Sequence, residues 1–404
     1  MNTGNKIVLL IFLSAFILRV GYIFCGLPLV SSELHLVFDQ DSYMKIAQTI
    51  LSGTYCDILR GPLYPFMIAF LMLLKGSTLL YLRLTHIFFD SLTACSLFFI
   101  GRKVFSHRIG ILAGFLYVVY PLALWRIAFV SKEIVFTFLL LLVVLFLIRS
   151  IESKQNRHFF MTGLILGIAN LCRPILLVFP CVFGIVYFIK NTEVFFKKKC
   201  LHVFLLIMGM CLVIFPWTYR NYALYEQVIP VATERGGLAI FIGNFYPTRG
   251  GWEGPKKQLW EEAVITIDLE NQGKTLVERD RVYYKKAIEA IVKNPVQFGE
   301  MVMYKFFRFW FISASGRMIT LLIPLQLFLL MCAMIGFFAK KKTGQYFWIL
   351  LSMLGYYMMI FLVTYSCVRF SLPIMPLVLV FSAAGIDSIV NSKFKIEKLK
   401  IKKM

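Results

Sequence analysis

The sequence FDQDSYMKIAQTILSGTYCDILRGPLYP, residues 38–65, follows an apolar segment, residues 7–30, that is long enough to cross a lipid bilayer. This short stretch combines two close carboxylates, Asp39 and Asp41, with an arginine, Arg60, and two prolines. Carboxylates and a cation held at a membrane surface suit a reaction on a charged lipid substrate. The same residues are also compatible with a solvated loop, and composition alone does not separate the two interpretations.

The composition of the whole chain indicates a membrane protein. Of its 404 residues, 59% are hydrophobic and only 16% are charged, whereas soluble domains have about 45–50% apolar and about 25% charged residues. Apolar runs recur without the alternation of barrel strands. Because a backbone in lipid must satisfy its own hydrogen bonds, these runs are predicted to be helices. The expected fold class is therefore all-α, a polytopic membrane helical bundle.

Hydropathy predicts about ten transmembrane helices. Two further helices are expected near the first span: residues 42–51 form an amphipathic pattern on the membrane face, and residues 63–74 are apolar but too short to span comfortably. The predicted spans cover approximately residues 7–30, 79–101, 109–124, 134–148, 159–171, 175–189, 201–217, 318–338, 347–365 and 372–390.

The formal net charge of +22 sets the predicted topology. In a soluble protein such a charge would suggest nucleic acid, but here the lysines and arginines gather in short loops between alternate spans. Such loops stay in the cytoplasm and favour anionic lipid headgroups. We therefore expect both termini in the cytoplasm, the candidate chemistry on the extracytoplasmic face, membrane lipids as partners and no nucleic acid.

Three regions are predicted along the chain. Within the outer segment at residues 220–317, the glycine-rich start is expected to be loop-like. Residues 258–292 are expected to be helical, and residues 298–311 are expected to form an aromatic-rich interfacial helix. The regions are an N-terminal transmembrane catalytic region at 1–219 with a first outer loop at 31–77, an outer segment with interfacial helices at 220–317, and C-terminal transmembrane helices with a basic cytoplasmic tail at 318–404.

Glycosyl transfer from a polyprenyl phosphate needs a base for the acceptor hydroxyl, cations for the leaving phosphate and an apolar groove for the lipid. Asp39 and Asp41 are the candidate bases. Arginines at span ends are also common as interfacial anchors. The candidate cations lie at or near span ends on the predicted outer side: Arg60, Arg126, Lys132, Arg173, Arg220 and Arg369.

Two other groups each have two interpretations. Glu133, in Ser131-Lys132-Glu133, is either part of a helix cap or a second acid of the site, and a helix N-terminus favours an anion there. The segment PWTYRNY at 216–222 is either an aromatic membrane anchor or part of the site through Arg220 and Asn221.

Several motifs occur in an order that resembles the GT-C membrane glycosyltransferases, in particular families 39 and 83, the protein-mannosyltransferase and aminoarabinose-transferase type. Each motif is short, but together they cover most of the chain. The motifs are DQDSY at 39–43 with Ala47 and Gly53, RGPLYP at 60–65, GIANLCRP at 167–174, PWTYRNY at 216–222 followed by the glycines of 236–243 and Asn244, and RFSLP at 369–373.

The resemblance implies an inverting transfer from a polyprenyl-phosphate sugar to an acceptor hydroxyl outside the membrane. It implies that Asp39 is the base and that Arg60 holds the donor phosphate. Family members often have Asp-Glu where this chain has Asp39-Gln40, so the base remains open between Asp39 and Asp41. Asp-x-Asp could also bind a divalent cation, but the resemblance implies no required metal or other cofactor. The predicted substrate-binding residues are Arg60, Tyr64, Lys132, Glu133, Arg173, Arg220, Asn221 and Arg369.

Two alternatives to this glycosyltransferase stay open. A surface-polysaccharide polymerase or ligase would use a polyprenyl-diphosphate glycan with the same spans and outer loop. A transporter or flippase would place charges within its spans, as Arg19, Arg83 and Asp90 are placed here. The sequence does not identify the sugar or whether the acceptor is a lipid, a glycan or a protein. Its lysine-rich loops favour a bacterial plasma membrane over the endoplasmic reticulum.

Overall fold

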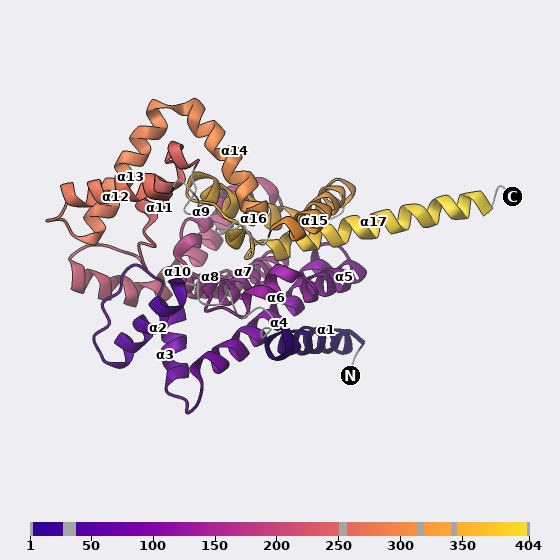
Figure 1. The fold of residues 1–404 in the computed structure, drawn as a ribbon. Coiled ribbons are helices and arrows are strands. Elements are labelled where there is room, and N and C mark those ends of the chain that lie inside the picture. The colour runs from indigo at the N-terminus through magenta and orange to yellow at the C-terminus, as the bar shows by residue number, and fades with distance from the viewer. Residues whose placement is uncertain (1–2, 27–37, 250–256, 313–318, 341–345, 402–404) are drawn as a thin grey trace. The chain divides into compact units, whose positions relative to one another are not determined.

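A computed structural model describes residues 3–26, 38–249, 257–312, 319–340 and 346–401, with the backbone alone at residues 3, 38–41, 319–321 and 393–401. Throughout these residues the regular structure is helical and includes no strand (Figure 1). The predicted all-α fold is therefore confirmed.

The chain forms two compact units. The first comprises residues 1–231, 329–353 and 373–404, and the second residues 232–328 and 354–372, so α15 (Ile319–Lys340) and α16 (Phe347–Val363) contribute to both. The other helices of the first unit are α1 (Thr3–Gly21), η1 (Tyr22–Gly26), α2 (Phe38–Leu51), α3 (Leu63–Met72), α4 (Thr78–Val104), α5 (His107–Val118), α6 (Pro121–Arg126), α7 (Lys132–Ser153), α8 (Asn156–Cys172), η4 (Pro174–Leu176), α9 (Phe179–Lys190), α10 (Phe196–Tyr225) and α17 (Met375–Ile401). The other helices of the second unit are α11 (Gly236–Gly243), η5 (Tyr246–Thr248), α12 (Lys257–Glu270), α13 (Leu276–Lys293), α14 (Pro295–Phe311) and η6 (Val368–Ser371).

Six helices of the described residues are long and apolar enough to cross a membrane. The four other predicted spans coincide with the shorter helices α5, α8, α9 and α16. Together they confirm a multi-pass helical membrane protein. The six helical segments are Gly4–Cys25, Thr78–Val104, Lys132–Ser153, Phe196–Tyr225, Leu322–Lys340 and Met375–Ser392.

Small residues let the helices of the first unit approach closely. A Cβ atom added at Gly163 of α8 would lie 2.2 Å from the Leu206 carbonyl of α10, and one at Gly209 of α10 would lie 2.4 Å from the Phe160 carbonyl. In lipid, helix association depends on such tight packing because apolar side chains gain little by leaving an apolar solvent. Substitution of either glycine by alanine would push α8 and α10 apart.

The predicted third span at residues 109–124 is not one helix. The helix α5 ends at Val118, and the short α6 begins at Pro121 after Tyr120, whose ψ of 115° is extended. Proline lacks an amide hydrogen and disfavours a helical residue before it. Pro121 therefore ends the span early and turns the chain toward Arg126.

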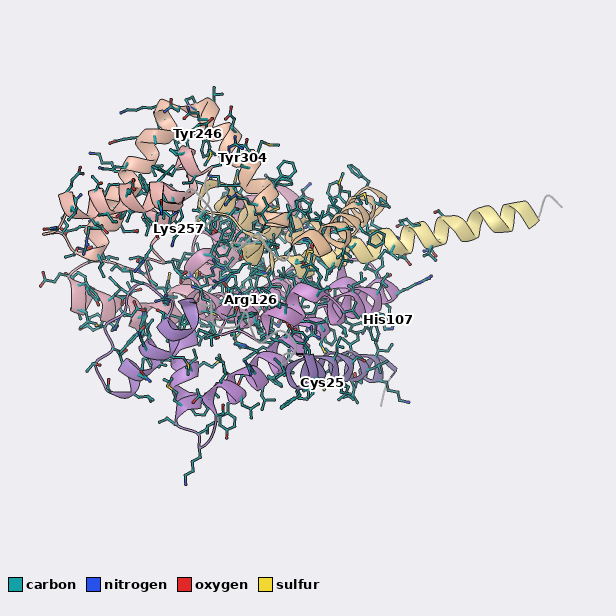
Figure 2. All side chains as sticks on the ribbon, in the orientation of Figure 1. Cys25, His107, Arg126, Tyr246, Lys257 and Tyr304 are labelled. Carbon is teal, nitrogen blue, oxygen red and sulfur yellow. The ribbon has the colours of Figure 1, made fainter. Side chains whose placement is uncertain are left out.

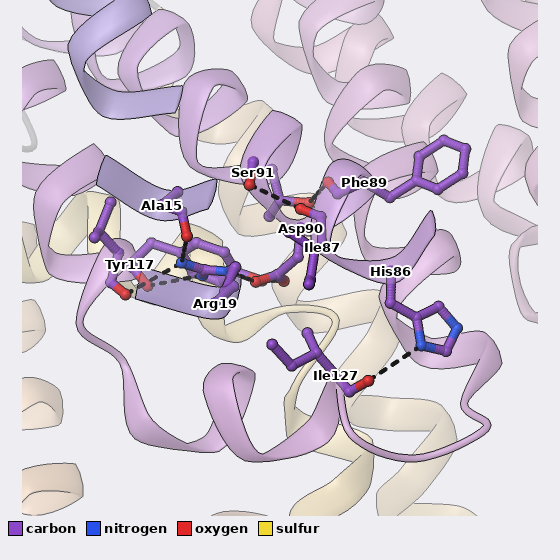
Figure 3. A network of polar contacts seen from close by, with 11 residues as sticks. Ala15, Arg19, His86, Ile87, Phe89, Asp90, Ser91, Tyr117 and Ile127 are labelled. Atoms are coloured by element: carbon purple, nitrogen blue, oxygen red, sulfur yellow. Dashed lines mark hydrogen bonds and ion pairs between the residues drawn. The ribbon is translucent and has the colours of Figure 1, made fainter. Parts of the chain in front are cut away.

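An ion pair links three helices of the first unit inside the membrane-spanning region. Arg19 of α1 donates to the Asp90 carboxylate of α4, and Tyr117 of α5 donates to the same carboxylate (Figure 3). Arg19 Nη1 also donates to the carbonyls of Ala15 and Val118 at 3.2 and 3.3 Å. Of the three intramembrane charges that favoured a transporter, Arg19 and Asp90 are thus paired with each other, and Arg83 Nε donates to the Ala128 carbonyl at 3.4 Å.

In the second unit, the predicted loop at the glycine-rich start of the outer segment is wrong for residues 236–243, which form α11. The Asp280 carboxylate of α13 accepts hydrogen bonds from the amides of Gly237 and Leu238 at 3.0 and 3.1 Å, so it caps the first turn of α11. A Cβ at Gly237 would lie 1.9 Å from the Asp280 carbonyl. Glycine here permits close packing of α11 on α13.

The rest of this unit follows the sequence pattern. The predicted helical stretch 258–292 forms α12 and α13, and α13 begins with a capping box between Thr275 and Glu278. Pro295 occupies the first position of α14, which carries the predicted aromatic helix. A core of apolar side chains packs α11, α12 and α13 together: Leu238, Ile242, Trp260, Ile267 and Tyr283.

Candidate active site

Asp39 and Asp41 stand in the first turn of a helix. The predicted helix at 42–51 begins earlier, at Phe38, so the expectation that both residues precede it in a loop is wrong. Positions 39 and 43 are one turn apart on the same face, and Tyr43 is buried on that face. Position 41 lies on the other side of the helix, as does the exposed Lys45. Of the two positions, 39 therefore lies on the helix face that carries the buried Tyr43.

Aromatic rings connect α2 to α3. Tyr43 and Tyr64 are both buried and meet edge to face, with ring centroids 5.0 Å apart. The guanidinium carbon of Arg60 lies 5.0 Å from the centre of the Tyr43 ring, a cation–π distance. Tyr64 Oη also lies 3.0 Å from His86 Nε2 of α4, and His86 Nδ1 lies 3.5 Å from the Ile127 carbonyl. These contacts place Arg60 beside α2.

Burial raises the pKa of Tyr64 well above its usual value. A backbone hydrogen bond from Ser131 opposes this shift, and the nearby Glu133 carboxylate adds to it. Tyr64 is therefore a protonated phenol that lies next to the start of α7. Sequence reasoning did not select His86, because a lone histidine inside an apolar span carries no spacing that indicates a partner.

A second group of charged residues closes the corner between α6 and α7. Arg126 Nε donates to Ser131 Oγ at 2.8 Å, and Ser131 Oγ donates to Glu133 Oε2 at 2.6 Å. Arg126 Nη2 lies 3.5 Å from the same Glu133 oxygen, and all three residues are buried. The Ser131 side chain makes no capping bond to α7. Glu133 is thus ion-paired with Arg126, and Ser131, at the N-cap position of α7, donates its hydroxyl to Glu133.

The C-terminal end of α8 contacts both the chain segment that follows Arg60 and the start of α7. A Cβ at Gly61 would lie 2.6 Å from the carbonyls of Leu171 and Cys172, so only glycine allows the chain after Arg60 to pass there. Cys172 Sγ donates to the Lys132 carbonyl at 3.9 Å. Arg173, the next residue, is buried with 7% of its surface exposed, and Lys132 is buried with 6%.

Asn170 fixes the turn that carries Arg173. Its Oδ1 accepts from the Leu176 amide at 3.0 Å, and its Nδ2 donates to the Leu166 carbonyl at 3.0 Å. The asparagine of the motif GIANLCRP therefore joins α8 to η4. This explains in part why an amide stands three residues before the arginine.

The side chains of Arg220 and Asn221 donate hydrogen bonds to backbone carbonyls of other segments of the chain. Arg220 Nη2 donates to the Tyr55 carbonyl at 2.8 Å and Nη1 to the Asp57 carbonyl at 3.3 Å. The Arg220 guanidinium also lies 4.7 Å from the ring centres of Tyr55 and Trp217. Asn221 Nδ2 donates to the carbonyls of Ile229 and Val231 at 3.0 and 2.9 Å. Arg220 therefore fastens the loop that leads to Arg60.

The structure thus gathers five of the predicted site residues, Arg60, Tyr64, Lys132, Glu133 and Arg173, with Arg126 and Ser131. We call these seven residues the helix-end cluster; Figure 2 labels Arg126 within it. Arg220 donates to the backbone of the loop at 55–57 and Asn221 to the carbonyls of Ile229 and Val231, so we do not count them in this cluster. Arg369 belongs to the second unit, where it lies in η6, tied to the end of α14 by a hydrogen bond from the Val368 amide to the Ile312 carbonyl.

Metal ligands do not gather in the described part of the chain. No group of three or more His, Cys, Asp or Glu side chains there could hold a metal ion. The side chains of Asp39 and Asp41 lie outside those described residues.

Residues 60–219 match the family described as dolichyl-phosphate-mannose-protein mannosyltransferase. This segment begins at Arg60 and contains the whole helix-end cluster. No curated protein sequence matches the chain.

Solved structures with a similar fold come from the oligosaccharyltransferase of Archaeoglobus fulgidus. Its apo form superposes with a TM-score of 0.59 at 14% identity, covering 98% of this chain and 52% of that one. Its complex with an inhibitory peptide and a dolichol-phosphate gives a TM-score of 0.56 at 16% identity, with the same coverage. The chain therefore spans about half the length of these structures. Together with the family match, this fold confirms the predicted GT-C resemblance.

Proposed function

We propose that this GT-C type membrane protein transfers a sugar from a polyprenyl-phosphate donor to an acceptor hydroxyl, with inversion at the sugar. The helix-end cluster holds the donor phosphate, and Asp39 takes the proton of the acceptor. The active site faces the extracytoplasmic side and both termini face the cytoplasm, because the lysine-rich loops alternate with the loops that carry the cluster. No metal or other cofactor is required.

The observation that carries this proposal is the excess of basic groups in the helix-end cluster. Arg60, Arg126, Lys132 and Arg173 supply four cations. The carboxylates are that of Glu133 and those of Asp39 and Asp41 at the start of α2. Even when all three carboxylates are counted, the four basic groups are in excess. Cations in excess at a partly buried place favour an anionic ligand, and arginine suits phosphate because its guanidinium donates two parallel hydrogen bonds.

The reaction follows from this placement. As the bond between the sugar and the phosphate breaks, negative charge grows on the leaving phosphate, and Arg60, Lys132 and Arg173 stabilise it. The carboxylate of Asp39 removes the proton from the acceptor hydroxyl as its oxygen attacks the anomeric carbon from the opposite side. Tyr64 supports Tyr43 and thereby the helix that carries Asp39. Arg220 and Asn221 shape the loop before Arg60.

A second candidate function has a specific observation in its favour. The similar structures belong to an oligosaccharyltransferase, and one of them is a complex with an inhibitory peptide and a dolichol-phosphate. A donor with a larger glycan on a polyprenyl diphosphate would use the same cations. The acceptor in that case would be a surface glycan or a protein.

Mass spectrometry of lipid-linked sugars in cells that lack the protein separates the two functions. The proposal predicts that a polyprenyl monophosphate with a single sugar accumulates, since its consumer is absent, and that the wild-type gene reverses this. Cells that carry the Arg60→Ala variant at the same protein level should keep the accumulated donor. A diphosphate-linked glycan in its place would favour the second function, and unchanged lipid pools would contradict both.

A further inference from the structure

The second unit contains a cavity of about 210 Å³ between α11, α13 and α14. Three phenylalanine rings and one tyrosine ring line it, together with three carboxamides. Tyr246, labelled in Figure 2, donates from its hydroxyl to Glu300 of α14 at 3.3 Å. The lining rings are Phe241, Phe245, Tyr246 and Phe298, and the carboxamides belong to Asn244, Asn294 and Gln297.

The described lining of this cavity includes no charged side chain. Lys305 of α14 is fully buried and donates to Asn244 Oδ1, on the cavity wall, at 2.8 Å and to the Val363 carbonyl at 3.1 Å. Burial lowers the pKa of Lys305 to about 7. Because its amine is directed to these two oxygens, it braces the wall and does not offer a cation to a ligand. The cavity thus differs from the helix-end cluster in the ligand that it suits.

The wall at the end of α11 is held on several sides. Asn244 Nδ2 donates to the Ile240 and Val363 carbonyls, both at 2.8 Å. A Cβ at Gly243 would lie 2.3 Å from the Thr364 carbonyl, so the backbone packs directly on its neighbour. A binding site gains affinity from such fixed walls because little is lost in ordering them.

The carboxamides at the rim differ from that of Asn244. Asn294 and Gln297 are exposed on and next to the first turn of α14, and Asn294 makes no capping bond to that helix. Each carboxamide offers two N–H donors and an acceptor oxygen. An acyl chain would need none of these groups, whereas a ligand with hydroxyls on its edge and C–H groups on its face would use both the rings and the amides.

We propose that this cavity binds a neutral sugar ring of the acceptor, with its face on the aromatic rings and its hydroxyls on Asn294 and Gln297. The assignment to the acceptor rests on the proposed function, whereas sugar binding itself does not. The acceptor would then be a glycan or a glycolipid. Pockets that fix orientation with a few polar groups among apolar walls are typical of small-ligand sites.

Ligand-observed NMR on the full chain in nanodiscs tests this inference. The probes are methyl glycosides of glucose, galactose, mannose and N-acetylglucosamine, with phenylalaninamide as a peptide-like competitor. We expect one glycoside to bind and Gln297→Ala and Tyr246→Ala each to weaken it about tenfold, as expected for one lost hydrogen bond or ring contact. Tyr304→Ala is the matched control, because Tyr304 is an exposed tyrosine of α14 outside the lining.

Three results would overturn the inference: no glycoside bound by folded wild-type protein at millimolar concentration, binding unchanged in both lining variants, or phenylalaninamide bound in preference to every glycoside. Sugar binding without consumption of a lipid-linked donor in cells would support the cavity as a sugar-binding site and contradict the proposed reaction. Donor consumption without sugar binding would do the reverse, so the two failures are distinguishable.

Discussion

Two clusters of the first unit both contain an arginine and a carboxylate, but they differ in charge balance. In the span cluster, made of Arg19, Asp90 and Tyr117, one cation meets one anion, and three backbone carbonyls accept from the Arg19 Nη1 and Nη2 atoms (Figure 3). The helix-end cluster contains four basic residues and one carboxylate, that of Glu133, which pairs with Arg126 at 3.5 Å. A balanced pair holds helices together, whereas an excess of cations at helix ends prepares a site for an anion.

The largest expected effect is on the rate of sugar transfer and comes from substitution of Asp39, the proposed base. Asp39→Asn keeps the side-chain shape and removes the base, so the rate of sugar transfer should fall by roughly 10²–10⁴. Asp41→Asn should cost much less, because position 41 lies on the other side of α2. Transfer from the donor accumulated in deficient cells to acceptors in membranes measures both rates.

The outcome also decides between the two carboxylates. An inactive Asp41→Asn beside a nearly normal Asp39→Asn would assign the base to Asp41. Full activity in both variants would remove the carboxylate mechanism, while donor binding at the helix-end cluster would still stand.

The next largest effect should appear in the span cluster as a loss of stability. Asp90→Asn leaves the buried Arg19 without its counter-charge, and breaking a buried pair in this way costs about 3–5 kcal/mol. Thermal unfolding in detergent should shift downward, while the folded fraction keeps its affinity for the donor. The double variant Arg19→Met with Asp90→Leu should recover much of the stability. A lost donor affinity in folded Asp90→Asn would erase the distinction between the clusters.

A third effect, on pH dependence, concerns Lys305, a buried cation whose two hydrogen-bond partners are neutral oxygens. Its pKa of about 7 in the folded protein lies below the usual value of 10.5, so the unfolded chain binds more protons between these values. The stability of the second unit should therefore rise as pH increases from about 7 to about 10.5. Hydrogen exchange of α11 and α14 measures this rise. Lys305→Met should abolish the slope, and an equal slope in that variant would refute the assignment.

The sequence predicted the helices and the charged site residues better than it predicted the points at which helices are interrupted. The apolar runs were sufficient for the membrane fold. The short motifs led to Arg60, Tyr64 and Arg173, and the start of the fourth span led to Lys132 and Glu133; the structure brings these five residues together. Hydropathy alone did not reveal the interruption at Pro121, although proline chemistry provides the reason.

Other features depended on contacts between distant residues. The helix α11 exists because Asp280 caps it from α13, which no local glycine pattern could indicate. His86 joins the site through Tyr64, and Arg220 faces the loop at 55–57. Such roles follow from tertiary packing, since neither residue type nor spacing identifies the partner.

The most direct test of the central claim is the affinity of the purified protein for farnesyl phosphate, a short polyprenyl phosphate, measured by calorimetry in wild type and in Arg60→Ala. If the helix-end cluster holds the phosphate, loss of its charged hydrogen bonds should weaken binding about 10–100-fold. Arg60→Lys should retain part of the affinity because it keeps the charge, and farnesol should bind wild type and variant equally weakly. An unchanged affinity of folded Arg60→Ala for farnesyl phosphate would contradict the account.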